Sequence, residues 1–324
     1  SPSAPPRTPE PTPGASPSPS APAAEGTPDD TPGEIRIAYI NLMSPIVLDE
    51  TDPVASETFE ERLAIVIEEL QSLRPDIVAV NEATWTEEHG SAWARLAAGL
   101  GMEGSSFARA TPWFPGLTEE ESRELREIAG FEEGEYLLVR SPYAILRSER
   151  KTLNPRVSES EARAALHVVV RGPGRLGEFD VYVTRLAGPE AVRAAQARDL
   201  LAWVEETRGS GPVLIFAGLE AEPDSPVVRI FLERGYVDLA AAQPASLTCC
   251  RPTVKAAEPL PQPDRRSEYV FSDRWAALSV QPFADEPRQM EDGSYLYASD
   301  HNGVFLVVPF APEPSVGAEG EEEP

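Results

Sequence analysis

Residues 76–82 read Asp-Ile-Val-Ala-Val-Asn-Glu, an apolar run that ends in two polar side chains. A short apolar run rich in β-branched residues predicts a buried strand. An alternating strand at residues 34–41 precedes it, and residues 56–73 between the two carry apolar side chains at helical spacing. Strand, helix and strand in this order predict a crossover unit with a sheet face to cover.

The rest of the central region alternates between strands and a few helices, with no internal repeat at a fixed period. The same patterns predict helices at residues 91–100, 119–128, 189–208 and 225–234, and strands at residues 135–140, 164–171, 179–186, 213–216, 268–272 and 303–309. This mixed order predicts an α+β fold, in which two mixed β-sheets pack face to face with helices outside, a four-layer α/β/β/α sandwich.

Both ends of the chain have the composition of solvated tails. Residues 1–33 are rich in Pro, Ser, Thr and Ala and have little apolar surface to bury, which predicts a disordered tether. Residues 311–324 form an acidic tail, so the folded domain is expected at residues 34–310. A Pro-rich stalk before a domain is typical of exported proteins, and we therefore expect a secreted or cell-surface protein.

The net charge limits the partners of the domain. The chain carries a formal charge of −26, to which the N-terminal tail contributes −3 and the C-terminal tail −5, leaving −18 for the domain. Such a field repels a polyanion, so tight binding of nucleic acid is disfavoured unless a basic groove or bound metal overrides it. No apolar run is long enough to span a bilayer, and a cell-surface or protein partner is the remaining expectation.

Six short motifs lie in order at the predicted strand ends. They are Tyr39-Ile40-Asn41, Val80-Asn81-Glu82, Thr184-Arg185-Leu186, Ala217-Gly218-Leu219-Glu220, Arg266-Ser267-Glu268-Tyr269 and Ser299-Asp300-His301.

This order and spacing resemble the endonuclease/exonuclease/phosphatase superfamily, whose usual motifs are Asn, Gln-Glu, Thr-His-Leu, Gly-Asp-Phe-Asn, Arg-Ile-Asp-Tyr and Ser-Asp-His. The resemblance spans residues 34–310 and implies the four-layer fold together with divalent-cation-dependent hydrolysis of phosphate esters.

The resemblance implies a cation site made of oxygen ligands. By position, Glu82 is the principal ligand, with Asn41 and Asp300 beside it, and Mg²⁺ or Mn²⁺ is the expected cation. The alternative is that the three residues are surface or hydrogen-bonding side chains at strand ends.

The groups that handle protons and phosphate depart from the family pattern. Arg185 stands where the family has its first His, and a guanidinium stays protonated and cannot act as a base. Gly218 replaces the family's Asp, and Glu220 replaces its Asn. Only the pair His301 and Glu268 survives, with Glu in place of Asp. Since each lost group typically costs about 10²–10⁴ in rate, we expect an impaired site.

Three functions remain open at this point. The first is a degenerate member of the superfamily that uses the fold for binding. The second is an active Mg²⁺- or Mn²⁺-dependent phosphodiesterase or phosphatase with a reorganised site, in which Glu220 is a ligand and His301 with Glu268 does the proton work. The third is a non-catalytic spacer. The adjacent Cys249 and Cys250 are either two thiols or, as the resemblance to exported members implies, a loop-stapling disulfide.

Overall fold

The computed structural model describes residues 33–45, 57–111, 118, 120–121, 123–124, 131–159, 161–241 and 247–310. The chain divides into two compact units, residues 1–31 and 32–324, and the first lies outside the described residues. The predicted tether, apart from Gly33, and the predicted acidic tail also lie outside them. The architecture below is therefore that of the second unit.

One mixed sheet contains seven strands, and its centre is the predicted crossover unit. The strands β1 and β2 pair in parallel, and the other pairs of this sheet are antiparallel. The order is β13 (Ser279–Phe283), β16 (Gly303–Phe310), β1 (Gly33–Asn41), β2 (Ile77–Thr86), β5 (Glu132–Val139) and β4 (Gly104–Ala110), with β3 (Gly90–Ser91) paired to β2.

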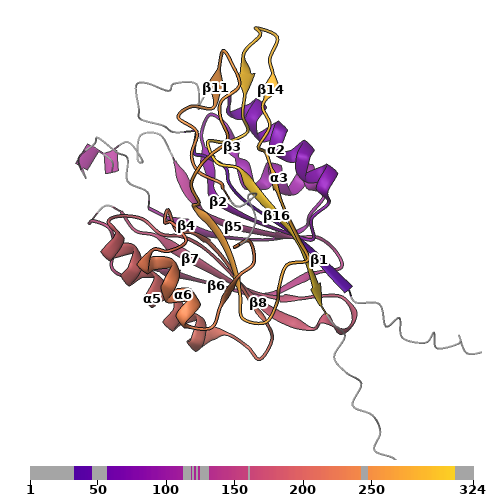
Figure 1. Ribbon diagram of the computed structural model, residues 1–324, viewed down its shortest axis with the longest axis vertical. Coiled ribbons are helices and arrows are strands. Elements are labelled where there is room, and N and C mark those ends of the chain that lie inside the picture. Colours follow the sequence, from indigo (N-terminus) through magenta and orange to yellow (C-terminus); the bar gives the residue numbers. More distant parts are fainter. Residues whose placement is uncertain are drawn as a thin grey trace, which may run out of the picture. The chain divides into compact units, whose positions relative to one another are not determined.

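The second mixed sheet contains six strands, and its only parallel pair is β8 with β9. The order is β10 (Val237–Asp238), β12 (Glu268–Ser272), β9 (Val213–Gly218), β8 (Glu178–Arg185), β7 (Ala164–Arg171) and β6 (Ala144–Thr152). A small third sheet, seen as a projecting arm in Figure 1, has the order β11 (Lys255–Ala256), β15 (Tyr295–Leu296) and β14 (Arg288–Gln289).

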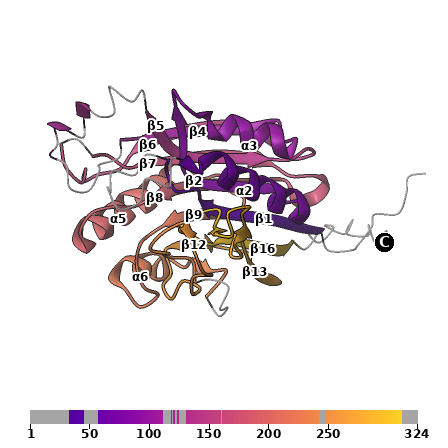
Figure 2. The same ribbon diagram turned by 90° about the horizontal axis from the view of Figure 1, so that it is seen from above.

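Helices cover the outer face of each large sheet (Figure 2). The helices α2 (Phe59–Leu73) and α3 (Ala92–Leu100) pack on the seven-stranded sheet, and α5 (Glu190–Thr207) and α6 (Pro226–Glu233) pack on the six-stranded sheet. Between the sheets lies a core of apolar side chains that both sheets supply, which buries the inner face of each. The predicted four-layer α+β sandwich is confirmed.

Serine side chains cap two of the predicted helices. Ser91 caps α3 by accepting a hydrogen bond from the backbone N–H of Ala94, and Ser225 caps α6 in the same way. The helix predicted over residues 56–73 begins at Phe59 instead, and most of the helix predicted over residues 119–128 lies outside the described residues.

The strands β4, β6 and β13 were not predicted from the sequence. All three are edge or outer strands, and β6 has no buried residue among its nine. An exposed edge strand needs no apolar alternation, and charged side chains on it prevent pairing with other chains. Its existence therefore depends on the neighbouring strand β7 rather than on its own pattern.

Among the described residues, no helix is long and apolar enough to cross a membrane.

Candidate functional site

The two parallel strand pairs bring the predicted motifs together. Residue Asn41 at the end of β1 lies opposite Asn81 of β2, and Arg185 at the end of β8 lies opposite Gly218 of β9. Glu268, the first residue of β12, also pairs with Gly218. Carboxyl ends of parallel strands meet at one edge of a sheet, and this is where α/β proteins commonly build their sites.

A cavity of about 820 Å³ lies at these strand ends. Its volume falls in the range of about 300–1,000 Å³ that is usual for small-molecule sites. The wall is strongly charged, with six carboxylates and four guanidinium groups. The lining residues are Glu82, Arg185, Glu190, Arg193, Glu220, Ala221, Glu222, Asp224, Ser225, Pro226, Cys249, Cys250, Arg265, Arg266, Asp300 and His301.

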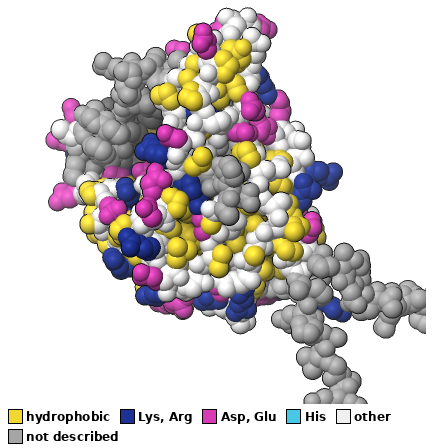
Figure 3. Space-filling model, in the orientation of Figure 1, with side chains coloured by type: hydrophobic (Ala, Val, Ile, Leu, Met, Phe, Trp, Pro, Cys, Tyr) yellow, Lys and Arg dark blue, Asp and Glu magenta, His cyan; other side chains and the backbone are white. Residues whose placement is uncertain are grey.

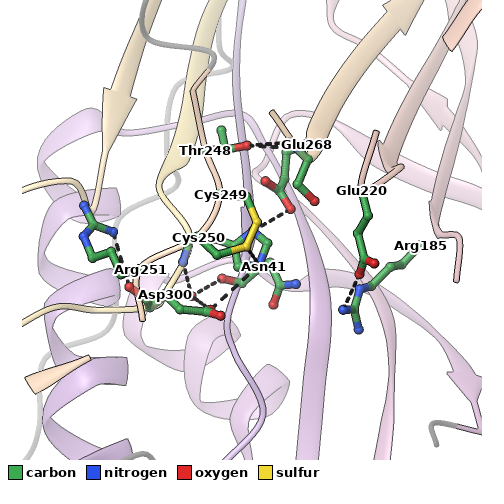
Figure 4. The surroundings of a disulfide bond; sticks show 12 residues. Asn41, Arg185, Glu220, Thr248, Cys249, Cys250, Arg251, Glu268 and Asp300 are labelled. Carbon is green, nitrogen blue, oxygen red and sulfur yellow. Dashed lines mark hydrogen bonds and ion pairs between the residues drawn. A yellow bond between two sulfur atoms is a disulfide. The ribbon is translucent and has the colours of Figure 1, made fainter. Parts of the chain in front are cut away.

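One side of the cavity is formed by the acid–arginine cluster, which we define as Glu82, Arg185 and Glu220. The Nη1 atom of Arg185 lies 2.6 Å from Oε1 of Glu82, and its Nη2 atom lies 2.6 Å from Oε1 of Glu220. Figure 4 shows Arg185 and Glu220 pointing toward one another. The guanidinium thus bridges a carboxylate on strand β2 of the seven-stranded sheet and a carboxylate in the loop after strand β9 of the six-stranded sheet.

The Glu82 carboxylate receives hydrogen bonds on both oxygens. The side-chain amide of Asn41 donates to Oε1 at 3.0 Å, and the backbone N–H of Ser44 donates to Oε2 at 2.8 Å. Burial opposes the charged form of Glu82, but the Arg185 guanidinium and these two donors outweigh it and lower the pKa to about 2. Glu82 is therefore a permanently ionised, fully partnered carboxylate.

Gly218 stands where the resemblance places the family's Asp. A Cβ atom at Gly218 would lie 2.9 Å from Oδ1 of Asn81 and 3.2 Å from Cγ of Arg185. The space that a larger side chain needs is thus taken by Asn81 and by the stem of Arg185. The three departures from the family pattern, Arg185, Gly218 and Glu220, are consequently one structural unit: the missing side chain makes room for the arginine, and the new glutamate pairs with it.

The predicted cation ligands lie together, but they do not fit a hard divalent cation in this arrangement. Asn41 turns its amide nitrogen toward Glu82, and its Oδ1 atom accepts from the backbone N–H of Met43 at 2.9 Å. Asp300 lines the same cavity, where burial raises its pKa. A cation in contact with Glu82 would also lie beside the Arg185 guanidinium, and two like charges in a buried site repel strongly.

The other side of the cavity is formed by the histidine corner, which we define as Glu268, His301, Cys249 and Cys250. Nδ1 of His301 lies 2.9 Å from Oε1 of Glu268, close enough for an ion pair but outside hydrogen-bond geometry. Both Glu268 oxygens are buried and have no hydrogen-bond partner. Burial opposes the charge on His301, but Glu268 and Asp300 outweigh it and raise the pKa to about 9.

Behind the acid–arginine cluster lies a buried polar layer that sequence reasoning did not identify. Burial raises the pKa of Glu133 to about 7 and that of Glu135 to about 8. The side-chain amide of Asn81 donates to Glu135, and the Tyr39 hydroxyl donates to Asn81. The only signal for this layer is the pair of Glu residues two positions apart in residues 133–135, which face one side of strand β5.

Comparisons with known proteins agree with this architecture. No protein-family profile matches the chain. Human nocturnin is 27% identical over 208 residues, which are 61% of this chain and 45% of nocturnin, and rat nocturnin is 26% identical over 208 residues. The chain thus spans less than half the length of the curated relatives it matches.

Solved structures extend the likeness to most of the chain. The catalytic domain of human nocturnin with a bound sulfate anion superposes with a TM-score of 0.60 and 19% identity, covering 85% of this chain and 93% of that domain. An endonuclease/exonuclease/phosphatase family protein of Bacteroides thetaiotaomicron superposes with a TM-score of 0.63 and 13% identity, covering 86% of this chain and 98% of that protein. A mannosyl-6-phosphatase of the same organism superposes with a TM-score of 0.62 and 13% identity, covering 85% of this chain and 100% of that protein.

The two sheets and their covering helices form a four-layer sandwich, and charged side chains line a cavity beside its two parallel strand pairs. The protein has the fold of the endonuclease/exonuclease/phosphatase superfamily, and the resemblance predicted from the motif order is confirmed.

Proposed function

We propose that this protein is a binding member of the endonuclease/exonuclease/phosphatase fold, in which Arg185 takes the place of the divalent cation and the family's hydrolysis is impaired. The observation that carries the proposal is the Arg185 guanidinium, which lies 2.6 Å from Glu82 and 2.6 Å from Glu220. It neutralises the acidic strand ends from within the chain, which removes the electrostatic demand that a bound cation would otherwise meet.

The protonation states support the same proposal. Activating a water molecule requires a proton acceptor near neutral pH. Arg185 stays protonated, and with a pKa of about 9 His301 is also protonated at pH 7, so it donates rather than accepts. Gly218 has no side chain to serve as a base, and Glu220 is held by Arg185. The cavity therefore has the volume and polarity of a binding site, and the positions to which the resemblance assigns proton transfer supply no free base at pH 7.

The ligand that we propose is small and polar rather than a nucleic acid. The cavity has six carboxylates on its wall, and four guanidinium groups of which Arg185 and Arg266 are already ion-paired within the chain. On the face seen in Figure 3, acidic and basic side chains are interspersed and form no basic stripe. A polyanionic strand needs such a stripe to offset the charge of its phosphates.

We also propose that the protein acts outside the cytoplasm, at the cell surface or in secreted form. Cys249 and Cys250 form a disulfide, and disulfides persist mainly in oxidising compartments. Fractionation of the source cells with an antibody to the chain tests this location, and recovery of the protein in the cytoplasmic fraction alone would contradict it.

Hydrolysis assays test the function. The purified chain is incubated with bis(4-nitrophenyl) phosphate, 4-nitrophenyl phosphate and DNA, each with Mg²⁺ or Mn²⁺. We expect turnover no higher than that of the Glu82→Ala and His301→Ala variants. Turnover in the wild-type chain that either variant abolishes would overturn the proposal in favour of a reorganised, active phosphoesterase.

A further inference from the structure

The histidine corner contains a group of soft ligands that the proposed function does not use. The Sγ atoms of Cys249 and Cys250 and a ring nitrogen of His301 all lie within 4.8 Å of one another. In the part of the chain that the structure describes, no other three His, Cys, Asp or Glu side chains meet this criterion. All three residues line the cavity, and Figure 4 shows the two sulfur atoms facing into the space between Asp300 and Glu268.

The histidine ring has a carboxylate beside one nitrogen and a sulfur atom beside the other. Its Nδ1 atom faces Oε1 of Glu268 at 2.9 Å, and its Nε2 atom faces Sγ of Cys250 at 3.6 Å. Metal-binding histidines usually direct their second nitrogen at a carboxylate, which sets the tautomer and makes the first nitrogen a better donor. Oδ1 of Asp300 lies 3.8 Å from the same Nε2 atom and offers an additional oxygen.

One pair of these ligand atoms already has the spacing of a tetrahedral centre. Zinc–sulfur and zinc–nitrogen bonds of about 2.3 and 2.0 Å at a tetrahedral angle place sulfur and nitrogen roughly 3.5 Å apart. The distance between Sγ of Cys250 and Nε2 of His301 is 3.6 Å. In the oxidised chain the two sulfur atoms are bonded to one another, and a disulfide sulfur is a poor ligand because the thiolate is the form that binds metal.

We propose that reduction of the Cys249–Cys250 disulfide opens a site for a thiophilic divalent cation such as Zn²⁺, held by both thiolates and by Nε2 of His301, with Asp300 as the fourth ligand. The oxidised pair keeps the site closed. This site differs from the Asn41, Glu82 and Asp300 set because its ligands are soft. Metal binding here does not depend on hydrolysis, so the test below can fail without contradicting the proposed function.

The reaction that opens the site balances with a dithiol reductant. The reductant gives two electrons and two protons to the protein disulfide, the bond between the two Sγ atoms breaks, and the reductant becomes a disulfide itself. When the cation binds, the two thiols and the His301 imidazolium each release one proton to solvent. The net effect is an exchange of three protons for one divalent cation.

Cobalt is the probe of choice because Co²⁺ in a tetrahedral thiolate site absorbs visible light. The full chain is reduced with a phosphine, freed of metal, and titrated with Co²⁺ under nitrogen, and oxidised chain is titrated in parallel. We expect tetrahedral cobalt–thiolate bands that saturate at one equivalent in the reduced chain and are absent from the oxidised chain. Displacement of Co²⁺ by Zn²⁺ should remove the bands, whereas excess Mg²⁺ should not.

Variants decide which residues hold the cation. His301→Gln and the double variant Cys249→Ser with Cys250→Ser should lose the bands, and His89→Gln, the same change at a histidine outside the cavity, should keep them. Glu268→Gln should weaken Co²⁺ binding by about 10- to 100-fold, as removal of a histidine's carboxylate partner does in metal sites. Circular dichroism confirms that each variant is folded.

Two results would overturn the proposal. One is a folded, fully reduced wild-type chain that shows no cobalt–thiolate bands. The other is a set of bands that survives in His301→Gln or in the double cysteine variant, because the cation would then be held elsewhere in the chain.

Discussion

The two sides of the cavity satisfy their charges in opposite ways. In the acid–arginine cluster, both oxygens of Glu82 receive donors, and Arg185 contacts both flanking carboxylates. In the histidine corner, both oxygens of Glu268 and Nδ1 of His301 are buried without a hydrogen-bond partner. Glu268 and His301 are thus held together by an ion pair at 2.9 Å alone, and buried polar groups without a hydrogen bond are uncommon in folded proteins.

This difference distinguishes a cluster whose charged groups already bind one another from a corner whose ligand atoms are available, after reduction, to a bound cation. The acid–arginine cluster lies where the resemblance predicts a metal cation. The Arg185 guanidinium supplies the positive charge there, so a ligand would find few free charged groups to bind. The histidine corner keeps a ring nitrogen and two sulfur atoms directed into the cavity. We therefore expect substitutions in the cluster to change stability, whereas substitutions in the corner should change metal binding and, through the charge on His301, the pH dependence of stability.

The largest effect is expected from Arg185→Met. This change leaves Glu82 buried and unpaired beside Glu133 and Glu220, and loss of one partner of a buried ion pair typically costs about 3–5 kcal/mol. Urea unfolding at pH 7 measures the change in the free energy of unfolding. The double variant Arg185→Met with Glu82→Gln should recover most of the loss. A loss below about 1 kcal/mol in the single variant would show that solvent already screens the cluster.

A pH-dependent effect comes next, from His301. Its pKa rises from 6.5 to about 9 on folding, so its contribution to stability is complete below pH 6.5 and is lost as the pH rises through 9. The size of this contribution is about 3 kcal/mol. Glu133 and Glu135, whose pKa values are also raised, lower stability over part of the same range.

The contribution of His301 is therefore measured as the difference in the free energy of unfolding between the wild-type chain and His301→Gln. Both proteins are unfolded in urea at a series of pH values from 6 to 10. The gap between the two unfolding free energies should narrow as the pH rises. A gap that stays constant over this range would mean that folding does not raise the pKa of His301.

A smaller effect tests whether Arg185 replaces the cation. Millimolar Mn²⁺ should leave the Tm of the wild-type chain unchanged, because the guanidinium already occupies the face of Glu82. In Arg185→Met, Glu82 and Glu220 are free to bind the ion, and Mn²⁺ at ten times its Kd should restore about 1.4 kcal/mol. Differential scanning calorimetry with and without Mn²⁺ measures the stabilisation of the wild-type chain and of Arg185→Met. Equal stabilisation of the two proteins would show that Arg185 does not exclude the cation.

The smallest effect is expected from Glu220→Gln. The Glu220 side chain is 35% exposed, compared with 12% for Glu82, so water screens its ion pair with Arg185. Exposed ion pairs are worth about 0–1 kcal/mol, and the loss in urea unfolding should lie in that range. A loss as large as that of Arg185→Met would mean that Glu220, rather than Glu82, is the main partner of the arginine.

The sequence was informative wherever a pattern repeats along the chain. Apolar alternation placed β1, β7 and β12 within a residue of their observed bounds, and the helical pattern placed α3 within a residue of its start. It failed for β6, because an exposed edge strand has no buried face to impose an alternation. The buried layer of Glu133 and Glu135 was also missed, because two glutamates in a strand look the same whether water or another sheet covers them.

The sequence by itself determined the fold and the identities of the residues at the strand ends, because periodicity and motif order are local properties that survive without coordinates. Only the tertiary structure decided which of those residues form ion pairs and how their pKa values shift. Arg185 could point to solvent or to Glu82, and the choice depends on the missing side chain at Gly218, which lies on a neighbouring strand. The raised pKa of His301 likewise depends on burial and on Glu268, thirty-three positions away in the chain but 2.9 Å away in space.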